Sequence, residues 1–247
     1  MIKGIAADLH THTNVSQHAY STAYENIVAA SRLGLYAVGI SDHGPAMEDG
    51  AGEGHFRNLR VLPRMVEGVR VLRGAEANIL DFNGNVDLSD NTRRERLDYC
   101  IASFHEDVCR PGTTAEHTAA YLALAEMPGI QIIGHSGTAC FAYDYEMVIR
   151  RFRETGKIVE INEASFHVRP GSIENCRKIA MLCKKYEVRI VVDTDSHFCS
   201  LIGRAPMSLE LLNSMDFPEK LVINANVENM ARWMEEDLKW NPGSSIK

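Results

Sequence analysis

Seven of the ten histidines stand at or just beyond the end of a short apolar run, where they could act together as metal ligands. The stretch from Asp8 to His12 reads Asp-Leu-His-Thr-His, and residues two apart on a strand point to the same face. The stretch from Asp193 to His197 repeats this alternation near the other end of the chain. Together with two carboxylates at equivalent places, the candidate ligands are His10, His12, His18, His43, Glu76, His105, His135, Asp195 and His197.

This ligand set indicates a cluster of divalent cations. Imidazole and carboxylate together suit zinc, manganese or iron, whereas magnesium prefers oxygen ligands alone. Nine ligands exceed the three or four that one catalytic zinc ion takes, so they suffice for two or three ions if a carboxylate bridges. Asp8 and Asp42 stand next to ligands, and each is explained equally well as a residue that orients an imidazole and as a turn or helix-cap aspartate.

The elements that must position these ligands alternate regularly along the chain. Short β-branched runs predict strands at Gly4–His12, Ala37–Asp42, Val69–Ala75, Leu97–Phe104, Gln131–His135, Ile158–Asn162, Val188–Asp195 and Lys220–Asn224. Amphipathic or alanine-rich segments predict helices at Ala23–Leu33, His55–Val66, Thr114–Glu126, Tyr143–Thr155 and Ser172–Tyr186. The alternation predicts an α/β fold with a parallel sheet, and the short connections favour a closed barrel over an open sheet.

A barrel would bring the candidate ligands together. The strands of a parallel barrel all open at their carboxyl ends on one side, where active sites form. No Gly-x-Gly-x-x-Gly pattern follows the first strand, which argues against dinucleotide binding. Because the sequence holds no internal repeat and no linker-like segment, we expect residues 1–247 to form a single domain.

Composition excludes several classes of protein. Apolar residues make up 45% and charged residues 24% of the 247, as in an ordinary globular protein. The formal net charge of −7 argues against a nucleic-acid partner. We expect a cytoplasmic protein without a membrane span, since no signal peptide and no apolar run of about 20 residues is present. The six cysteines include no CxxC pair and are expected to be buried, reduced thiols.

The motifs taken together resemble those of the PHP (polymerase and histidinol phosphatase) family. That family carries D-x-H-x-H, D-H, a lone Glu, two separated His and D-x-H in this order, and the chain has them all between Asp8 and His197. The similarity is greatest to the YcdX-like metal-dependent phosphatases, through the stretches at residues 18–22, 41–45, 103–106 and 160–166. Two positions depart from the pattern: Ser136 stands where relatives often have proline, and Asp193 where a small residue is common.

The resemblance implies a distorted (β/α)7 barrel, TIM-like, with a trinuclear metal site at the carboxyl ends of the strands. Three divalent ions are implied, usually zinc, with manganese or iron as alternatives. The first ion would be held by His10, His12, Glu76 and Asp195. Glu76 would bridge to the second ion, which would be completed by His105 and His135. The third would be held by His18, His43 and His197.

We therefore expect a phosphoric monoester hydrolase that acts on small phosphorylated substrates. Three dications against two carboxylates leave the site about four charges positive, which favours a phosphate dianion. A hydroxide that bridges metals at Glu76, with Asp195 and His197 beside it, would attack the phosphorus in line. Arg169, in the loop after the sixth strand, is either a further phosphate contact or a solvated loop arginine.

Several alternatives stay open at this point. The same metal site would serve a histidinol-phosphate phosphatase or a PHP-type nuclease, and a catalytically silent metal-binding regulatory protein would also keep the ligands. Of the other histidines, His55 and His117 are expected at the surface, and His167 as a lining of the pocket. The segment Val227–Trp240 has apolar residues spaced like one helix face, which would pack on the barrel or join the subunits of a homo-oligomer.

Overall fold

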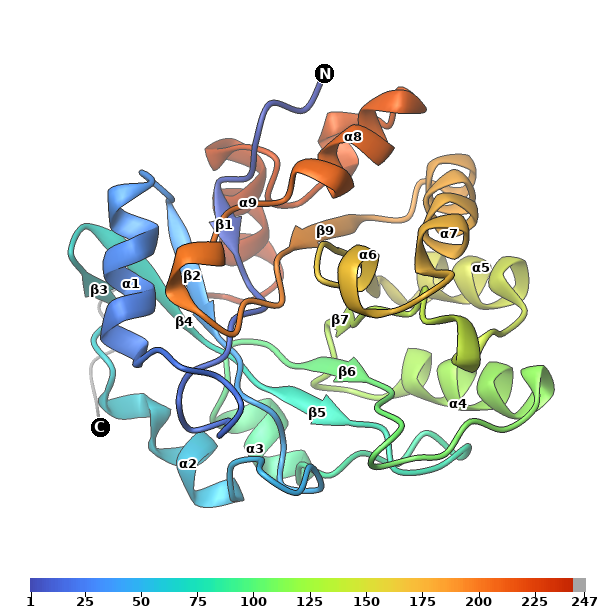
Figure 1. The fold of residues 1–247 in the computed structure, drawn as a ribbon, viewed down its shortest axis with the longest axis horizontal. Helices are drawn as coiled ribbons and strands as arrows, with labels where there is room; N and C mark the ends of the chain where they lie inside the picture. The colour runs from blue at the N-terminus through green and yellow to red at the C-terminus, as the bar shows by residue number, and fades with distance from the viewer. Residues whose placement is uncertain (242–247) are drawn as a thin grey trace.

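Short parallel strands alternate with helices throughout the computed structural model, which describes residues 1–241 (Figure 1). One four-stranded sheet has the order β1-β2-β4-β3, formed by β1 (Ala7–Asp8), β2 (Ala37–Ile40), β3 (Met65–Val66) and β4 (Val69–Arg73). A five-stranded sheet follows chain order, formed by β5 (Glu76–Asn78), β6 (Ile101–Ser103), β7 (Ile132–Ile133), β8 (Ile158–Asn162) and β9 (Ile190–Asp193). All neighbouring strands are parallel except β3 and β4. The chain thus has a mixed α/β fold with parallel sheets.

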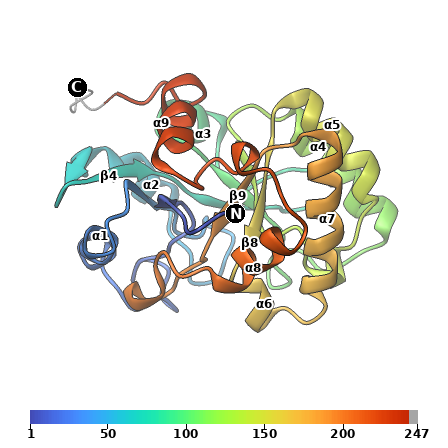
Figure 2. The same ribbon diagram turned by 90° about the horizontal axis from the view of Figure 1, so that it is seen from above.

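Helices flank the strands on both sides. In the described residues they are α1 (Ala23–Arg32), α2 (Glu53–Asn58), α3 (Asp90–Glu95), α4 (Thr114–Glu126), α5 (Tyr145–Thr155), α6 (Ser165–Val168), α7 (Ser172–Tyr186), α8 (Pro206–Ser214) and α9 (Val227–Glu236). Short 3₁₀ helices lie between them: η1 (Leu59–Val61), η2 (Ala139–Phe141), η3 (Cys199–Leu201) and η4 (Glu219–Leu221). α1 lies on one side of the strands, and α4, α5 and α7 pack together on the opposite side (Figure 1, Figure 2).

Local sequence signals explain where several helices begin and end. α1 and α4 each begin with a capping box: the hydroxyl of Thr22 or Thr113 accepts a hydrogen bond from the third helical amide, and the glutamate at that third position accepts one from the threonine amide. α5 ends at Gly156, whose left-handed conformation (φ 76°) glycine adopts without steric cost. These signals are local, so the predicted segments for these helices agree closely with the structure.

Two single backbone bridges connect the sheets without making them one closed sheet. Thr11, beyond β1, pairs with Ser196, beyond β9. His43, beyond β2, pairs with Glu76 at the start of β5. Both bridges are parallel and involve or adjoin candidate ligands, so the backbone that joins the sheets also sets the spacing of those ligands.

Apolar side chains form two separate cores. The larger core lies between the strands and the covering helices, and includes Ile40, Val71, Leu124, Phe152 and Ile179. The smaller core takes one residue from each of seven strands and three from α9: Ala7, Ala37, Leu72, Ile101, Ile132, Ile158, Val191, Met230, Trp233 and Met234. α9 therefore packs against the strands, which is the first of the two roles expected for its segment.

The predicted helix at His55–Val66 overlaps α2 as far as Asn58 and the 3₁₀ helix η1 as far as Val61, and it is wrong beyond that residue. Pro63 lacks an amide hydrogen and disfavours a helical conformation in the residue before it, and the chain continues instead into β3. A turn of two residues with positive φ (50° and 77°) then joins β3 to β4. The strand predicted at Val69–Ala75 corresponds to β4, which ends at Arg73, and a separate strand, β5, begins at Glu76, so Glu76 begins a strand rather than following one.

The strand predicted at Lys220–Asn224 is also wrong. The segment contains the end of η4 and a single bridge between Val222 and Ile190. The side-chain amide of Asn224 bonds to both the N–H and the C=O of Val192, and thereby takes backbone bonds that a neighbouring strand would have made. Hydrogen bonds from the Asn224 side chain thus replace those of a strand ladder, and the apolar composition of the segment does not reveal this replacement.

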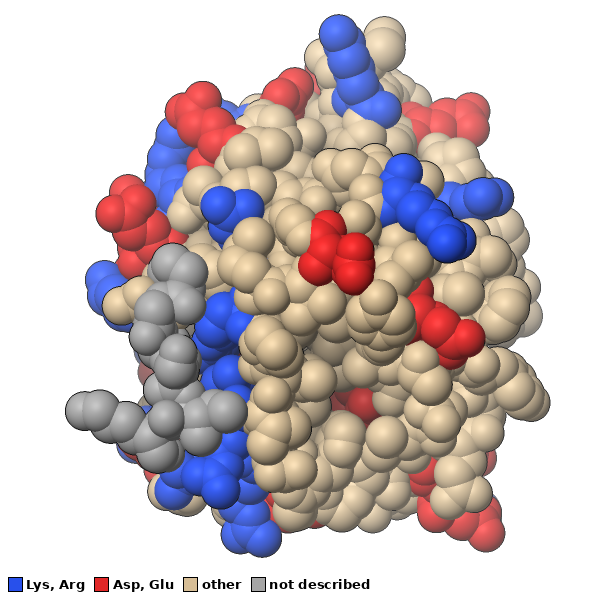
Figure 3. Space-filling view, turned by 90° about the vertical axis from the view of Figure 1, so that its left-hand side faces the viewer, with Lys and Arg blue, Asp and Glu red and all other residues tan. Residues whose placement is uncertain are grey.

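Both signs of charge lie on the surface. Seen from the side that carries α1 and β3, Lys and Arg gather in one strip, whereas Asp and Glu are scattered (Figure 3). Among residues 1–241, no helix has the length and apolar character needed to cross a membrane. Four cysteines are buried, but Cys140 is exposed and Cys199 half-buried because they lie on η2 and η3 at the surface, so the expectation of buried thiols fails for these two.

Candidate metal centre

The structure brings all nine predicted ligand residues into one cluster. Each has a side-chain nitrogen or oxygen within 3.4 Å of another member. Most stand directly after strands of the two parallel sheets, whose carboxyl ends meet there. The cluster runs from a fully buried floor at His10, His12 and Glu76 to an exposed edge at His18.

Glu76 lies at the centre of this cluster. Its Oε2 lies 2.7 Å from His43 Nδ1 and 3.2 Å from His10 Nε2. Its Oε1 lies 2.9 Å from His135 Nε2 and 3.4 Å from His105 Nε2. A carboxylate with two imidazole nitrogens beside each oxygen has the surroundings needed to bridge two cations.

Asp195 faces the cluster with one oxygen and an arginine with the other. Its Oδ1 lies 3.0 Å from His12 Nε2 and 3.5 Å from His10 Nε2. Its Oδ2 accepts hydrogen bonds from the guanidinium of Arg169, whose Nη2 lies 3.2 Å away. Arg169 is therefore half-buried and tied to a candidate ligand, so it is not a solvated loop arginine.

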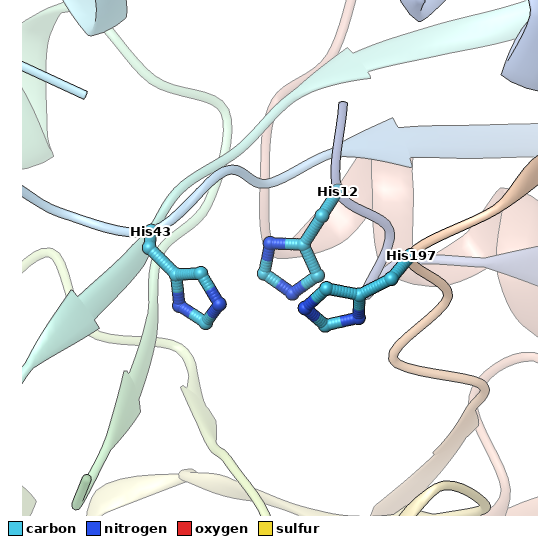
Figure 4. Close-up of side chains that lie close together, drawn as sticks. All are labelled: His12, His43 and His197. Carbon is cyan, nitrogen blue, oxygen red and sulfur yellow. The ribbon is translucent and has the colours of Figure 1, made fainter. Parts of the chain in front are cut away.

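The rings of His12, His43 and His197 come from three different strand ends and face one another (Figure 4). The ring centre of His12 lies 4.1 Å from that of His43 and 4.4 Å from that of His197. His18 joins this group at the exposed edge, with its Nε2 2.8 Å from His197 Nε2. Within residues 1–241, three sets have ligand atoms within 4.8 Å of one another: His12, His43 and His197; His10, His12 and Glu76; and His43, Glu76 and His105.

Several polar atoms of the cluster are buried without a hydrogen-bond partner. They are His10 Nε2, His12 Nδ1, His43 Nδ1, His43 Nε2, Glu76 Oε2 and His105 Nε2. Some of them approach one another, but without the alignment of a hydrogen bond. An unpaired buried polar group costs about 1–3 kcal/mol, and such groups are rare in folded proteins. A concentration of them on imidazole and carboxylate side chains fits divalent cations, whose ligands these groups are.

Burial and neighbouring charges fix the protonation of the cluster. Burial acts to raise the pKa of Glu76, but the surrounding imidazoles, that of His10 first, hold this pKa well below its usual range. Burial lowers the pKa of His12 to about 3 and that of His135 to about 4. At neutral pH these groups are a carboxylate and two neutral imidazoles, which are the forms that bind metal. Burial acts to lower the pKa of His10 and of His43, but the carboxylate of Glu76 outweighs it and raises both, so a metal ion must compete with a proton for these two rings.

Three side chains outside the predicted set contact ligand imidazoles. Glu160 Oε1 lies 2.6 Å from His10 Nδ1, Asn78 Oδ1 lies 2.7 Å from His105 Nδ1, and Asp49 Oδ2 lies 2.6 Å from His18 Nδ1. None of the three was predicted from the sequence. Glu160 does carry a signal, because an acidic residue inside an apolar strand is seldom left without a partner, whereas Asn78 and Asp49 carry none.

Asp8 and Asp42 make no hydrogen bond to a ligand imidazole within the described part of the chain. Asp8 accepts bonds from the backbone and hydroxyl of Thr194. Asp42 accepts bonds from the backbone and hydroxyl of Thr13, and lies 3.3 Å from His55 Nε2. Both aspartates tie connecting segments together, as turn aspartates do.

Two candidate ligands have backbone conformations that side-chain-bearing residues rarely adopt. His135 has a φ of 24° and Asp195 a φ of 56°. Strain of this kind costs about 1–3 kcal/mol and persists where the surroundings enforce it, which is common at functional sites. Their neighbours must therefore hold these two residues in place.

The remaining histidines lie outside the cluster. His117 is 1% exposed, so its predicted surface position is wrong: its ring accepts a bond from the Gly112 amide and packs among aromatic rings. His55 is half-buried because it packs toward Asp42. The side chain of His167 is 61% exposed, so it lies on the surface and lines no enclosed pocket.

A model of the PHP domain matches residues 8–165. The chain belongs to the PHP domain family. A probable phosphatase of Clostridium botulinum is 46% identical to it over 222 residues, which are 90% of each chain. A probable phosphatase of Acetivibrio thermocellus is 43% identical over 228 residues, which are 92% of this chain and 94% of the relative.

Solved structures share the fold of this PHP domain at low sequence identity. Histidinol phosphate phosphatase from Lactococcus lactis, in a crystal structure with zinc, L-histidinol and phosphate, has a TM-score of 0.56 at 14% identity and covers 85% of this chain and 91% of its own. A chain from the cryo-EM structure of archaeal ribonuclease P with mature tRNA has a TM-score of 0.59 at 15% identity and covers 97% of each chain. At such identities the likeness concerns the fold alone.

The two departures from the PHP pattern are both buried behind the ligands. The Ser136 hydroxyl accepts a bond of 3.2 Å from the Tyr143 hydroxyl. Asp193 Oδ1 accepts a bond of 2.7 Å from the Leu9 amide. Each side chain therefore makes a buried hydrogen bond next to a candidate ligand, and neither takes the place of a ligand.

Proposed function

We propose that this PHP domain is a metal-dependent phosphoesterase that hydrolyses small phosphomonoesters. The observation that carries the proposal is the convergence of nine imidazole and carboxylate side chains whose buried polar atoms include six without a hydrogen-bond partner. The relatives that share 40% identity or more over nine-tenths of the chain are named probable phosphatases, which supports phosphate ester as the bond that is broken.

Three divalent ions would occupy the cluster. His10, His12, Glu76 and Asp195 would hold the first, Glu76, His105 and His135 the second, and His18, His43 and His197 the third. The four imidazoles around the two Glu76 oxygens support a shared carboxylate. Zinc suits a set this rich in imidazole, and manganese and iron are the alternatives. The Lactococcus lactis neighbour was solved with zinc, which agrees with that choice.

The chain's own residues would bind and orient the substrate. Divalent ions, when bound, supply hydroxide at neutral pH and neutralise the charge on phosphate oxygens. Arg169 holds Asp195 from the outer side and would offer its remaining N–H groups to a phosphate oxygen. The side chain of His18 is 44% exposed, so the substrate would enter on its side of the cluster. His10 and His12 are fully buried at the inner end of the cluster, so they would keep water out of that end.

The strands would form a distorted (β/α)7 barrel within a single domain of residues 1–247. Only two residues separate β4 from β5, so the two count as one bent strand. The backbone bridges Thr11–Ser196 and His43–Glu76 join the two sheets to each other, which supports a closed barrel. The smaller core also takes one side chain from each of seven strands, as the interior of a barrel does.

Metal analysis combined with an activity screen tests the proposal. Purified protein would be loaded with zinc, manganese or iron, its metal content measured, and turnover followed on p-nitrophenyl phosphate, histidinol phosphate, nucleoside monophosphates and single-stranded DNA. We expect close to three ions per chain and turnover of small phosphomonoesters that chelation abolishes. Undiminished turnover after complete removal of metal would contradict the proposal. Metal binding without turnover of any substrate would instead point to a silent regulatory protein.

A further inference from the structure

Glu160 reaches two candidate ligands with one buried carboxylate. It lies on β8, is 1% exposed, and belongs to none of the proposed ligand sets. Its Oε1 lies 2.6 Å from Nδ1 of the His10 ring. Its Oε2 accepts a hydrogen bond of 2.6 Å from the backbone N–H of His135. Because both oxygens are taken up by nitrogen groups, Glu160 has the contacts of a residue that holds ligands and not those of a ligand.

The first contact fixes which nitrogen of His10 is free. A carboxylate can only accept, so the hydrogen of a neutral His10 ring must lie on Nδ1. Nε2 then keeps its lone pair, and it lies 3.2 Å from Glu76 Oε2 and 3.5 Å from Asp195 Oδ1. This is the nitrogen that points into the cluster, and it is one of the buried atoms without a hydrogen-bond partner.

The second contact holds a strained backbone. His135 has a φ of 24°, a conformation that an isolated histidine would leave. Glu160 binds its N–H, and the ring then reaches Glu76 with Nε2 2.9 Å from Oε1. Without that acceptor, the peptide group would be free to rotate and would carry the ring away from Glu76.

We propose that Glu160 is a positioning residue that orients a ligand in each of the two ligand sets that share Glu76. It sets the tautomer of His10, which belongs to the first ligand set, and the backbone of His135, which belongs to the second. The third set, at His18, His43 and His197, has no contact with Glu160 among the described residues. The inference rests on the proposed function for the presence of the ions, and it goes further in making two of them depend on one carboxylate that binds neither.

Glutamine cannot replace Glu160, although it has the same shape. An amide has one accepting oxygen, whereas two donors must be served. If the amide NH₂ faces His10, the ring hydrogen must move to Nε2, where it blocks a metal ion. If the NH₂ faces His135, two N–H groups oppose each other at a residue that is already strained. Glu160→Gln therefore harms one of the two ligand sets in either orientation, that of His10 or that of His135.

Glu163 provides a matched control. It is a second buried glutamate just beyond the same strand, 5% exposed, and it accepts bonds from the backbone of Met207 and Ser208 at the start of α8. It contacts no candidate ligand among residues 1–241. Glu163→Gln therefore reproduces the loss of a buried carboxylate charge without touching the cluster.

The experiment measures zinc retained per chain during competition with a chelator of known affinity. We expect wild type and Glu163→Gln to retain all their ions alike, and Glu160→Gln to bind at least one of the two ions that share Glu76 about 10- to 100-fold more weakly while keeping the third. Equal retention by Glu160→Gln and wild type overturns the role of Glu160 and leaves the proposed function standing. A wild type that binds no divalent ion overturns both.

A spectroscopic measurement keeps the inference testable if Glu160→Gln does not fold. In the zinc-loaded wild type, nitrogen-15 NMR should show His10 with its hydrogen on Nδ1 and in slow exchange, since Glu160 buries and binds it. Zinc on Nε2 by itself leaves the hydrogen on Nδ1, so the slow exchange of that hydrogen, and not the tautomer, reports on the bond to Glu160. A His10 Nδ1 hydrogen that exchanges rapidly with water contradicts the proposal outright.

Discussion

The Nε2 atoms of His18 and His197 lie 2.8 Å apart and face each other at the exposed edge of the cluster. Nδ1 of His18 lies 2.6 Å from a carboxylate oxygen of Asp49, and Nδ1 of His197 lies 2.9 Å from the backbone oxygen of Asp195. Both oxygens accept hydrogen bonds, so each neutral ring carries its hydrogen on Nδ1. Two lone pairs then face each other, which is favourable only if a metal ion or a shared proton lies between them.

Replacing His18 by alanine should therefore remove about one ion per chain and leave the other two in place. His18 is exposed, so we expect the free energy of unfolding of the metal-free protein to change by no more than about 1 kcal/mol. Metal content measured by mass spectrometry checks this result. His167→Ala is the control, because it removes an exposed histidine outside the cluster. An unchanged metal content in His18→Ala would show that the third ligand set is wrong.

Glu76→Gln should reduce kcat/KM by roughly a thousandfold, which corresponds to about 4 kcal/mol of transition-state stabilisation. Glutamine keeps the size of the side chain but removes the charge that four imidazoles surround. The first two ions share this carboxylate, so metal content should fall together with activity. Steady-state kinetics and metal analysis on the same sample provide the measurement. An activity within tenfold of wild type would mean that Glu76 does not bridge.

How far the sequence predicts this molecule depends on whether a signal is local. α4, α7 and β8 agree with the predicted segments residue for residue, because caps and apolar periodicity lie within each segment. β3 was hidden inside an amphipathic run, because only pairing with β4 makes it a strand. The segment at Lys220–Asn224 failed for the converse reason, since a side-chain amide took the bonds of the expected ladder.

The candidate site follows the same rule. Most of the nine ligand residues could be assembled from the sequence because parallel strands present their carboxyl ends together, whereas Glu76 begins β5 and His18 lies in a turn beyond β1. The partners that orient the rings could not be, since the contacts of Asn78 with His105 and of Asp49 with His18 depend on distances between loops. His117 was misplaced because the aromatic rings that bury it come from three separate segments of the chain.

Arg169→Ala should lower kcat/KM by about 10- to 100-fold, because a charged hydrogen bond to phosphate is lost. Arg169→Lys keeps the charge but not the planar fork, so it should recover only part of the loss. The inhibition constant for inorganic phosphate separates two roles of this residue. A weaker inhibition in Arg169→Ala indicates direct contact with phosphate. Unchanged inhibition with reduced metal affinity would limit Arg169 to holding Asp195.

Glu163→Ala should lower the free energy of unfolding by roughly 2 kcal/mol and leave the metal content unchanged. The buried carboxylate accepts bonds of 3.0 and 2.8 Å from the amides of Met207 and Ser208, and one of 2.7 Å from the Ser208 hydroxyl. Alanine leaves these donors at the start of α8 unpaired. Urea unfolding of the metal-free variant and wild type measures the difference. Loss of metal in this variant would contradict the separation drawn between Glu163 and Glu160.

Lys157 stands directly before β8 and is buried, with 8% of its surface exposed. Its Nζ donates hydrogen bonds of 2.7 and 2.6 Å to the backbone oxygens of Met127 and Ile130. Burial lowers the pKa of Lys157 from 10.5 to about 8, and the neighbouring charge of Glu126 compensates only in part. In the folded protein this lysine therefore loses its charge within an accessible range of pH.

The stability of the protein should respond to that loss in a defined direction. Between about pH 8 and pH 10.5 the unfolded chain still holds the Lys157 proton while the folded protein has released it, so the free energy of unfolding rises with pH. The rise cannot exceed about 3 to 4 kcal/mol, and Lys157→Met should lack it altogether. Urea unfolding of both proteins at about pH 7.5, 9 and 10.5 gives the difference between their free energies of unfolding. The titration of all other groups cancels in that difference. We expect that difference to shift in favour of wild type as the pH rises. A constant difference would mean that Lys157 keeps its proton through the whole range.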